Sequence, residues 1–254
     1  MKRTFVRCVI RGERRAALVE EGSLYDFGGG MGTDAVRGER IGALEDIESY
    51  LPPSSPGKVV AIGLNYRDHA AEVGKPLPEE PLLFLKPSTS VVAHGEPVVY
   101  PPAMTSRVDY EAELGVVIGS RCKGVSPEQA LACVLGYTCA NDVTARDLQN
   151  KDGQWTRAKS FDTFCPLGPY VVCGIDPSDL EIKMLLNGET VQSSRTSNLI
   201  FPVPVLVSHI SQVMTLEPGD VIITGTPSGI APVKKGDVMR VEIEGLGALE
   251  NRVE

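Results

Sequence analysis

The first quarter of the chain contains short apolar runs separated by turns. Residues 5–10 (Phe-Val-Arg-Cys-Val-Ile) precede the turn Arg11-Gly12-Glu13, and further apolar runs continue to about residue 27. Runs of this kind predict a β-meander. Residues 28–43 are rich in glycine and charge, which predicts a loop. The proline-rich segment 51–57 is the clearest linker in the chain. We therefore expect a small N-terminal β-rich domain over 1–57 and a larger domain over 58–254.

The larger domain has more strand patterns than helix patterns. Val59–Ile62 is typical of a buried strand, residues 182–186 alternate up to the hairpin signal Asn187-Gly188, and residues 239–243 alternate again. Helices are predicted over Val205–Met214, after the capping sequence Ser126-Pro127-Glu128-Gln129, and from Asn65 as N-cap to Val73. Without a regular βαβ alternation, the pattern predicts an α+β fold that is mostly β.

One predicted strand carries acids on a single face. In the segment Asp109–Gly119, Asp109, Glu111 and Glu113 are two residues apart and lead into a strongly apolar run, so their side chains share a face. Stacked carboxylates repel unless water or a cation intervenes, and a hard divalent metal such as Mg²⁺ or Mn²⁺ is the stronger explanation. Asp142 follows a second β-like run and completes a candidate ligand set with Glu111 and Glu113. For Asp109 we prefer a charge at the strand start or a supporting contact.

Composition narrows the function classes. A formal charge of −8 and a pI of about 5.1, without a basic cluster, argue against a nucleic-acid or anionic-membrane partner. No apolar run approaches the length of a membrane span, and the first residues lack the apolar core of a secretory signal. None of the six cysteines forms a Cys-x-x-Cys pair, which favours reduced thiols and a cytoplasmic location.

Four further groups are candidates for chemistry. His69 and Glu72 are three residues apart on a predicted helix, a spacing that suits an oriented general base but on its own favours a surface ion pair. The proline-rich loop that follows is typical of a mobile lid and keeps the catalytic interpretation open. Lys159 lies in an aromatic stretch and could stabilise an oxyanion, or simply extend from the edge of the core to solvent. Arg146 and Gln149 could hold a substrate carboxylate. The glycine-rich turn Thr224–Gly229 could bind an anion through its backbone N–H groups.

Several motifs together resemble the fumarylacetoacetate hydrolase family over residues 58–254. The motifs are Asn65–Glu72, Phe84–Pro87, Asp109–Gly119, Asn141–Gln149, Arg157–Asp162 and Gly219–Gly229. The resemblance implies a mixed β-roll, usually dimeric, with a Mg²⁺ or Mn²⁺ site. It matches Glu111, Glu113 and Asp142 to the metal ligands, His69 and Glu72 to a catalytic dyad on a lid, and Lys159 to the active-site lysine. It also matches Arg146, Gln149 and Thr226 to substrate contacts.

The resemblance implies a metal-dependent hydrolase that cleaves the C–C bond of a 1,3-diketo or 2-oxo acid of the acylpyruvate or fumarylpyruvate type. Isomerisation of a 5-carboxymethyl-2-hydroxymuconate-type substrate, or decarboxylation of an oxaloacetate-type 2-oxo acid, could use the same site. We expect a role in aromatic compound catabolism and a homodimer. A rival of another class is a metal-dependent scaffold without catalysis, for which His69 and Lys159 would have no purpose.

Overall fold

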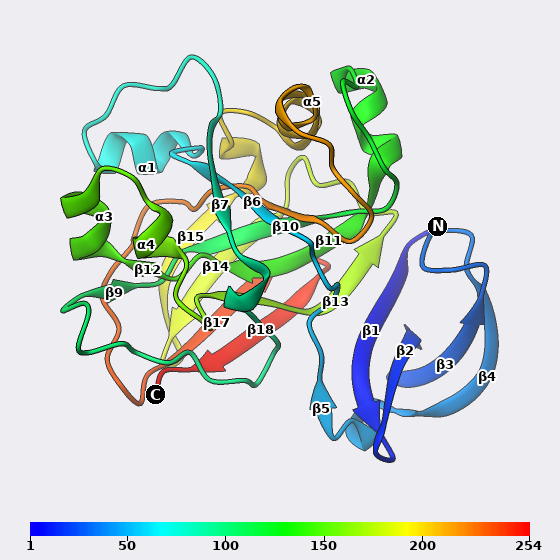
Figure 1. Cartoon of the computed structure of the whole chain (residues 1–254). Helices are drawn as coiled ribbons and strands as arrows, with labels where there is room; N and C mark the ends of the chain where they lie inside the picture. The colour runs from blue at the N-terminus through cyan, green and yellow to red at the C-terminus, as the bar shows by residue number, and fades with distance from the viewer.

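The computed structural model of the protein describes residues 1–254 and consists mainly of β-strands. Figure 1 shows an N-terminal meander beside a larger body in which strands curl around a common core. The first strands are β1 (Arg3–Ile10), β2 (Glu13–Glu20), β3 (Ser23–Gly28), β4 (Val36–Ala43), β5 (Ser49–Tyr50), β6 (Val59–Gly63), β7 (Leu82–Lys86), β8 (Val91–Val92) and β9 (Val108–Asp109). They are followed by β10 (Ala112–Ile118), β11 (Val134–Asn141), β12 (Thr144–Ala145), β13 (Cys165–Cys173), β14 (Glu181–Leu186), β15 (Glu189–Arg195), β16 (Val221–Ile223), β17 (Val238–Ile243) and β18 (Gly247–Arg252).

The helices are short and lie at the periphery of the sheets. They are α1 (Arg67–Glu72), α2 (Pro127–Ala130), α3 (Arg146–Asp152), α4 (Thr156–Lys159) and α5 (Val203–Val213), with 3-10 turns at 44–46, 88–90, 131–133 and 196–198. None of the helices is both long and apolar enough to cross a lipid bilayer. The prediction of an α+β, mostly β fold is confirmed.

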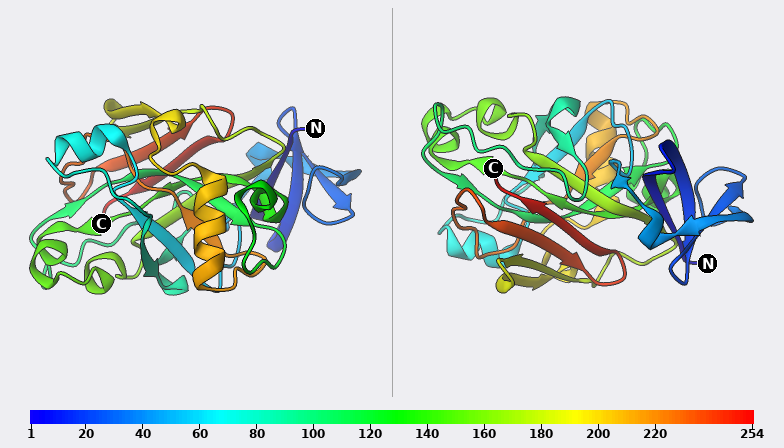
Figure 2. Two further views of the ribbon diagram at one scale, coloured as in Figure 1. Left: turned by 90° about the horizontal axis from the view of Figure 1, so that it is seen from above. Right: turned by 90° about the horizontal axis from the view of Figure 1, so that it is seen from below.

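A large sheet connects the two parts of the chain. Its path runs β4-β3-β2-β1-β13-β11-β10-β16-β6-β7, with β5 paired to β1 and β8 paired to β13. The pair β16–β6 is parallel, and its neighbours β10 and β7 are antiparallel to it. A second sheet has the order β15-β14-β17-β18, and β12 pairs with β9. The N-terminal meander therefore continues the large sheet through β1, although Figure 2 shows it projecting to one side. The division at residue 57 stays a prediction.

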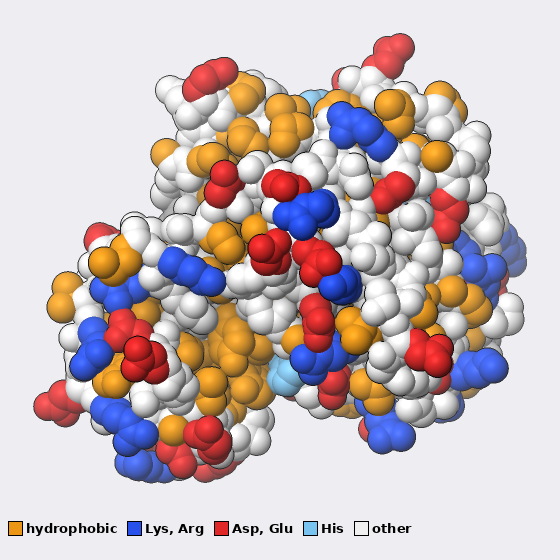
Figure 3. All heavy atoms as spheres, turned by 180° about the vertical axis from the view of Figure 1, so that it is seen from behind, with side chains coloured by type: hydrophobic (Ala, Val, Ile, Leu, Met, Phe, Trp, Pro, Cys, Tyr) orange, Lys and Arg blue, Asp and Glu red, His pale blue; other side chains and the backbone are white.

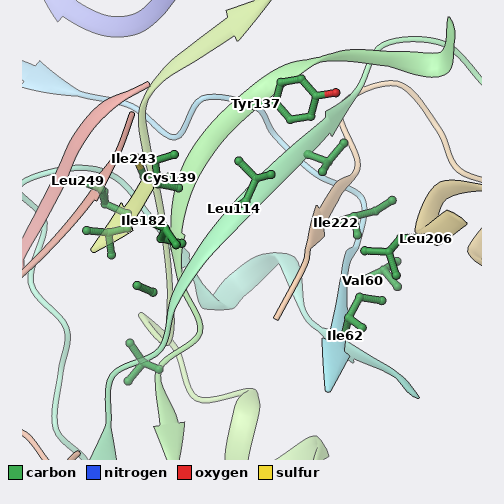
Figure 4. Packing of buried hydrophobic residues seen from close by; sticks show 14 of the residues in the cluster. Val60, Ile62, Leu114, Tyr137, Cys139, Ile182, Leu206, Ile222, Ile243 and Leu249 are labelled. Carbon is green, nitrogen blue, oxygen red and sulfur yellow. The ribbon is translucent and has the colours of Figure 1, made fainter. Parts of the chain in front are cut away.

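Alternate residues of β6 enter two different parts of the core, which is why this strand is apolar throughout. Val60 and Ile62 belong to the main cluster between the sheets and α5, whereas Val59 and Ala61 belong to a second cluster on the opposite face. Figure 4 shows Val60, Ile62 and Ile222 gathered against Leu206 of α5, apart from the residues of the second sheet. A strand covered on both faces has no polar side.

Several local predictions are confirmed and two are wrong. Asn187 and Gly188 have φ of +53° and +87° between β14 and β15, as a two-residue hairpin requires. The loop predicted over 28–43 is wrong, because β4 occupies its second half and pairs with β3. The Asn65 cap is also wrong. Tyr66 is the N-cap of α1, and the Asn65 amide donates to the carbonyls of Thr224 and Phe201.

One side of the molecule carries charges of both signs. Acidic and basic side chains are interspersed over the side seen in Figure 3. All six cysteines are free and buried, as the sequence indicates.

Candidate active site

Three carboxylates converge at one end of the β10–β11 pair. Glu113 is the second residue of β10, Glu111 lies just before that strand, and Asp142 follows β11. Because Ala112 pairs with Asn141, Asp142 is brought opposite Glu111 and donates its backbone N–H to the Glu111 carbonyl at 2.9 Å. One oxygen from each carboxylate lies within 4.8 Å of the others, and all three side chains are buried.

Two buried lysines and one arginine contact these acids. Lys159 Nζ lies 2.9 Å from Glu111 Oε2 and 2.5 Å from Asp142 Oδ2. Lys86 forms an ion pair with the other Asp142 oxygen and donates to the Val143 carbonyl at 3.2 Å. Arg146 forms an ion pair with Glu111 and donates to Asp109 at 2.9 Å. Asp109 is therefore bound by Arg146 and by Arg107, which agrees with a supporting role.

The three acids differ in their electrostatic environment. Burial, together with repulsion from Asp142 and Glu111, raises the pKa of Glu113 well above its ordinary value. Burial also acts to raise the pKa of Glu111, but Lys159 and Arg146 more than offset it, so that pKa is lowered. Burial acts against the charge of Lys159, yet Asp142 and Glu111 raise its pKa, so the ammonium stays protonated.

The donor set fits a hard divalent cation. Three carboxylate groups in a buried cluster are the ligands that Mg²⁺ and Mn²⁺ prefer. One oxygen of Glu113 accepts the Gly225 N–H at 2.7 Å, and its other oxygen makes no hydrogen bond. This free oxygen, on the acid that is least matched by positive charge, supports a cation at this position.

The predicted contact between His69 and Glu72 is present. His69 Nδ1 lies 2.9 Å from Glu72 Oε2, and the second oxygen of Glu72 accepts the Gly229 N–H at 2.9 Å. The helix that carries both residues is held by Arg67, which donates to the Leu199 carbonyl at 2.6 Å. The imidazole is thus oriented by a carboxylate that is itself fixed.

A cavity of about 390 Å³ collects eight of the nine candidate residues. They are Glu111, Glu113, Asp142, His69, Lys159, Arg146, Gln149 and Thr226. Glu72 is not part of the lining, but it contacts His69, which is. Phe84 and Trp155 line the same cavity with their rings in edge contact, and Lys159 Nζ lies 5.0 Å from the Phe84 ring centroid. The aromatic setting expected for Lys159 is therefore a cation–π contact.

The predicted substrate contacts have partners within the protein. Arg146 directs its donors to Asp109, Glu111 and the side-chain oxygen of Gln149. Its guanidinium is thus occupied before any ligand arrives. Thr226 Oγ1 accepts from Gln192 Nε2 at 2.9 Å, which leaves its O–H free to donate into the cavity. The roles of Arg146, Gln149 and Thr226 toward a substrate stay predictions.

Lys86 is not among the candidate residues predicted from the sequence. Its side chain is fully buried and touches a candidate metal ligand. The one signal was its position in the motif Phe84–Pro87, at the end of a strand that pairs with the apolar strand β6. Lysine at a strand end is usually solvated, so the pattern alone gave no reason to bury it.

The chain is similar to known proteins over most of its length. Residues 58–254 match the family described as fumarylacetoacetate (FAA) hydrolase, C-terminal. The chain is 39% identical over 272 aligned positions to 2,4-didehydro-3-deoxy-L-rhamnonate hydrolase of Sphingomonas sp., covering 98% of this chain and 95% of that protein. It is 42% identical over 227 positions to mitochondrial oxaloacetate tautomerase fahd2 of Xenopus laevis, covering 85% and 71%.

A solved structure shares the fold over the whole length. It is 2-hydroxyhepta-2,4-diene-1,7-dioate isomerase from Mycobacterium marinum, with a TM-score of 0.90, 42% identity, and coverage of 99% of this chain and 98% of that chain. The match includes the strands and turns that carry the three carboxylates. The chain therefore belongs to the fumarylacetoacetate hydrolase family.

Proposed function

We propose that this enzyme is a Mg²⁺- or Mn²⁺-dependent hydrolase that cleaves the C–C bond of a 1,3-diketo or 2-oxo acid of the acylpyruvate or fumarylpyruvate type. The observation that carries the proposal is that a fixed His–Glu dyad, a buried ammonium and a carboxylate triad open into the same cavity. We further propose, on the family resemblance alone, that it acts as a homodimer in aromatic compound catabolism.

The triad would hold the metal ion through Glu111, Glu113 and Asp142. Bound there, the ion would act as a Lewis acid toward the oxygens of a 2-oxo acid and lower the energy of developing enolate charge. Lys86 and Lys159 each contact a different oxygen of the Asp142 carboxylate and so compensate its buried charge.

In this proposal His69 acts as the base. Glu72 accepts from Nδ1, so the lone pair of Nε2 is free to take a proton from water. The hydroxide equivalent adds to the distal carbonyl, and Lys159 stabilises the oxyanion that forms. The C–C bond then breaks, its electron pair passes to the 2-oxo acid fragment, and the proton held by His69 returns to that carbon. The products are pyruvate, or a substituted 2-oxo acid, and a carboxylic acid.

An isomerase, tautomerase or decarboxylase is the second candidate on the same site. The similarity to a diene-dioate isomerase and to an oxaloacetate tautomerase favours it, because such proton transfers need His69 but no attacking water. Decarboxylation would need the stabilised enolate alone.

A panel of 2-oxo acids with Mg²⁺ and with Mn²⁺, with products identified by mass, separates these activities. Loss of acylpyruvate absorbance reports hydrolysis, and release of CO₂ from oxaloacetate reports decarboxylation. The variant His69→Ala should retain metal binding and lose hydrolysis by about 10²–10⁴-fold, the usual contribution of a general base. His209→Ala, on α5 and outside the cavity lining, is the matched control. An unchanged rate of acylpyruvate cleavage in His69→Ala would show that another group is the base.

A further inference from the structure

Lys75 is the one basic side chain of the cavity lining without an acidic partner. The basic residues of the lining are His69, Lys75, Arg146 and Lys159. Arg146 and Lys159 form ion pairs with buried acids, and His69 contacts Glu72. Lys75 forms no ion pair and its ammonium makes no hydrogen bond, although its side chain borders the same space. An unpaired cation in a cavity is available to a ligand.

The inner part of the site does not need the charge of Lys75. Three of the acids there, Asp109, Glu111 and Asp142, form ion pairs with the bases Lys86, Arg107, Arg146 and Lys159, and Glu113 forms none. Four basic side chains thus already stand beside four acidic ones. A bound divalent ion would add further positive charge. The ammonium of Lys75 is therefore surplus to the charge balance of the protein itself.

The position of Lys75 is fixed by the way α1 ends. The backbone N–H of Lys75 donates to the Ala70 carbonyl at 3.0 Å, and that of Gly74 donates to the Ala71 carbonyl at 3.2 Å. Gly74 has φ of +64°. This pair of bonds around a left-handed glycine is a Schellman motif. It brings Lys75, which lies just beyond the end of α1, into the lining of the cavity to which α1 contributes His69.

Apolar side chains form much of the remaining wall. Lys75 is exposed, whereas the three carboxylates are buried, so the cation and the metal-ligand cluster lie at opposite depths of the cavity. The apolar lining residues are Ile62, Leu64, Val73, Phe84, Trp155 and Ile230. This lining suits a ligand with polar groups at the buried carboxylates, a hydrocarbon part against the apolar residues and a negative charge near Lys75.

We propose that Lys75 is a specificity-determining residue that binds a carboxylate at the outer end of the substrate. The preferred substrates are then 2-oxo acids with a second carboxylate, separated from the first by a carbon chain. The backbone N–H groups of Gly74 and Lys75 donate to carbonyls at the end of α1, so they are not available to a ligand. The ammonium of Lys75 is then the only charged donor there, which matches one carboxylate. This inference rests on the proposed function, since it takes a 2-oxo acid to be the ligand of the inner site.

Two ligands of equal chain length test the proposal by calorimetry on the Mg²⁺-loaded protein. 2-Oxoglutarate and 2-oxopentanoate both have five carbons and differ in the terminal carboxylate. Neither is a 1,3-diketone, so neither is a substrate for the proposed hydrolysis. We expect the native protein to bind 2-oxoglutarate about tenfold more tightly, as for one charge-assisted contact near solvent. The preference should weaken as ionic strength rises.

The variants decide which residue is responsible. Lys75→Met should abolish the preference, and Lys75→Glu should reverse it. Lys235→Met, which removes an exposed lysine outside the cavity lining, should keep it. Equal binding of the two acids by the native protein, or an undiminished preference in Lys75→Met, would overturn the role of Lys75 and leave the proposed function standing. Failure of both acids to bind would overturn the proposed function and this inference with it.

Discussion

Replacing Lys86 with methionine should destabilise the metal-free protein by about 3 kcal/mol. The side chains of Lys86 and Asp142 are 0% and 1% exposed, so the substitution leaves a carboxylate without one of its partners in the interior. Removing one member of a buried ion pair costs about 3–5 kcal/mol. The lower end applies because Lys159 remains 2.5 Å from the other oxygen of Asp142. Methionine keeps the unbranched shape of the stem, so packing changes little.

A divalent metal should reduce this cost. With Lys86 absent, the cluster carries one positive charge fewer, and a cation among the carboxylates is repelled less. We therefore expect Lys86→Met to bind Mg²⁺ more tightly than the native protein and to gain more stability from it. Loss of folding stability together with gain of metal affinity is the signature of a buried compensating charge.

Urea unfolding in EDTA and in Mg²⁺ measures both effects. Lys58→Met is the matched control, because Lys58 also pairs with a buried aspartate but is itself 25% exposed. In this variant Asp220 would still accept hydrogen bonds from the backbone N–H groups of Lys58 and Glu217, at 3.1 and 2.8 Å. The free energy of unfolding should therefore fall by only about 1 kcal/mol. If Lys86→Met lowers the free energy of unfolding in EDTA by no more than Lys58→Met does, the reasoning about buried charge is wrong.

Two further predictions concern single titratable groups. Glu113→Gln should weaken Mn²⁺ binding by about 100-fold or more, as measured by calorimetry, because it removes a candidate ligand. In EDTA near pH 7 the same substitution should not destabilise the protein, because burial and neighbouring acids raise the pKa of Glu113 and so disfavour its charge. An unchanged Mn²⁺ affinity would contradict the place of Glu113 in the ligand set. Burial lowers the pKa of His94 from its ordinary 6.5, and its neutral ring accepts the Glu250 N–H at 3.0 Å. The unfolded chain takes up this proton more readily, so stability should fall as pH drops below about 6.5, and the fall should be smaller in His94→Gln. Urea unfolding at pH 5.5 and 7.5 tests this, and equal pH dependence in the two proteins would count against it.

The elements that sequence reasoning located are those whose pattern follows from burial. Ile182 and Met184 face the core of the second sheet and alternate with half-exposed residues, so the period of two is visible. β4 was missed because most of its side chains are exposed, and it is held by backbone pairing with β3. Backbone pairing of a polar edge strand leaves little trace in the order of side chains.

The proximity of candidate site residues could be predicted where they are close in sequence. Glu111 with Glu113, and His69 with Glu72, have spacings that imply a shared face, and the structure brings each pair together. The internal contacts of Arg146 could not be predicted, because they depend on how α3 is placed against two distant acids. Sequence spacing alone does not give the register of the strands, and that register decides which distant acid the guanidinium contacts.

The pairing of β1 with β13 has a consequence for shortened forms of the protein. Arg3–Val6 of β1 pair with Tyr170–Cys173 of β13, so the N-terminal meander covers the edge of β13 that does not face β11. A chain that began at the linker would leave those backbone groups unpaired beside apolar side chains such as Val171 and Val172. Exposed strand edges of this kind pair with strands of other molecules. We therefore expect a chain shortened to residues 58–254 to self-associate more readily than the full chain.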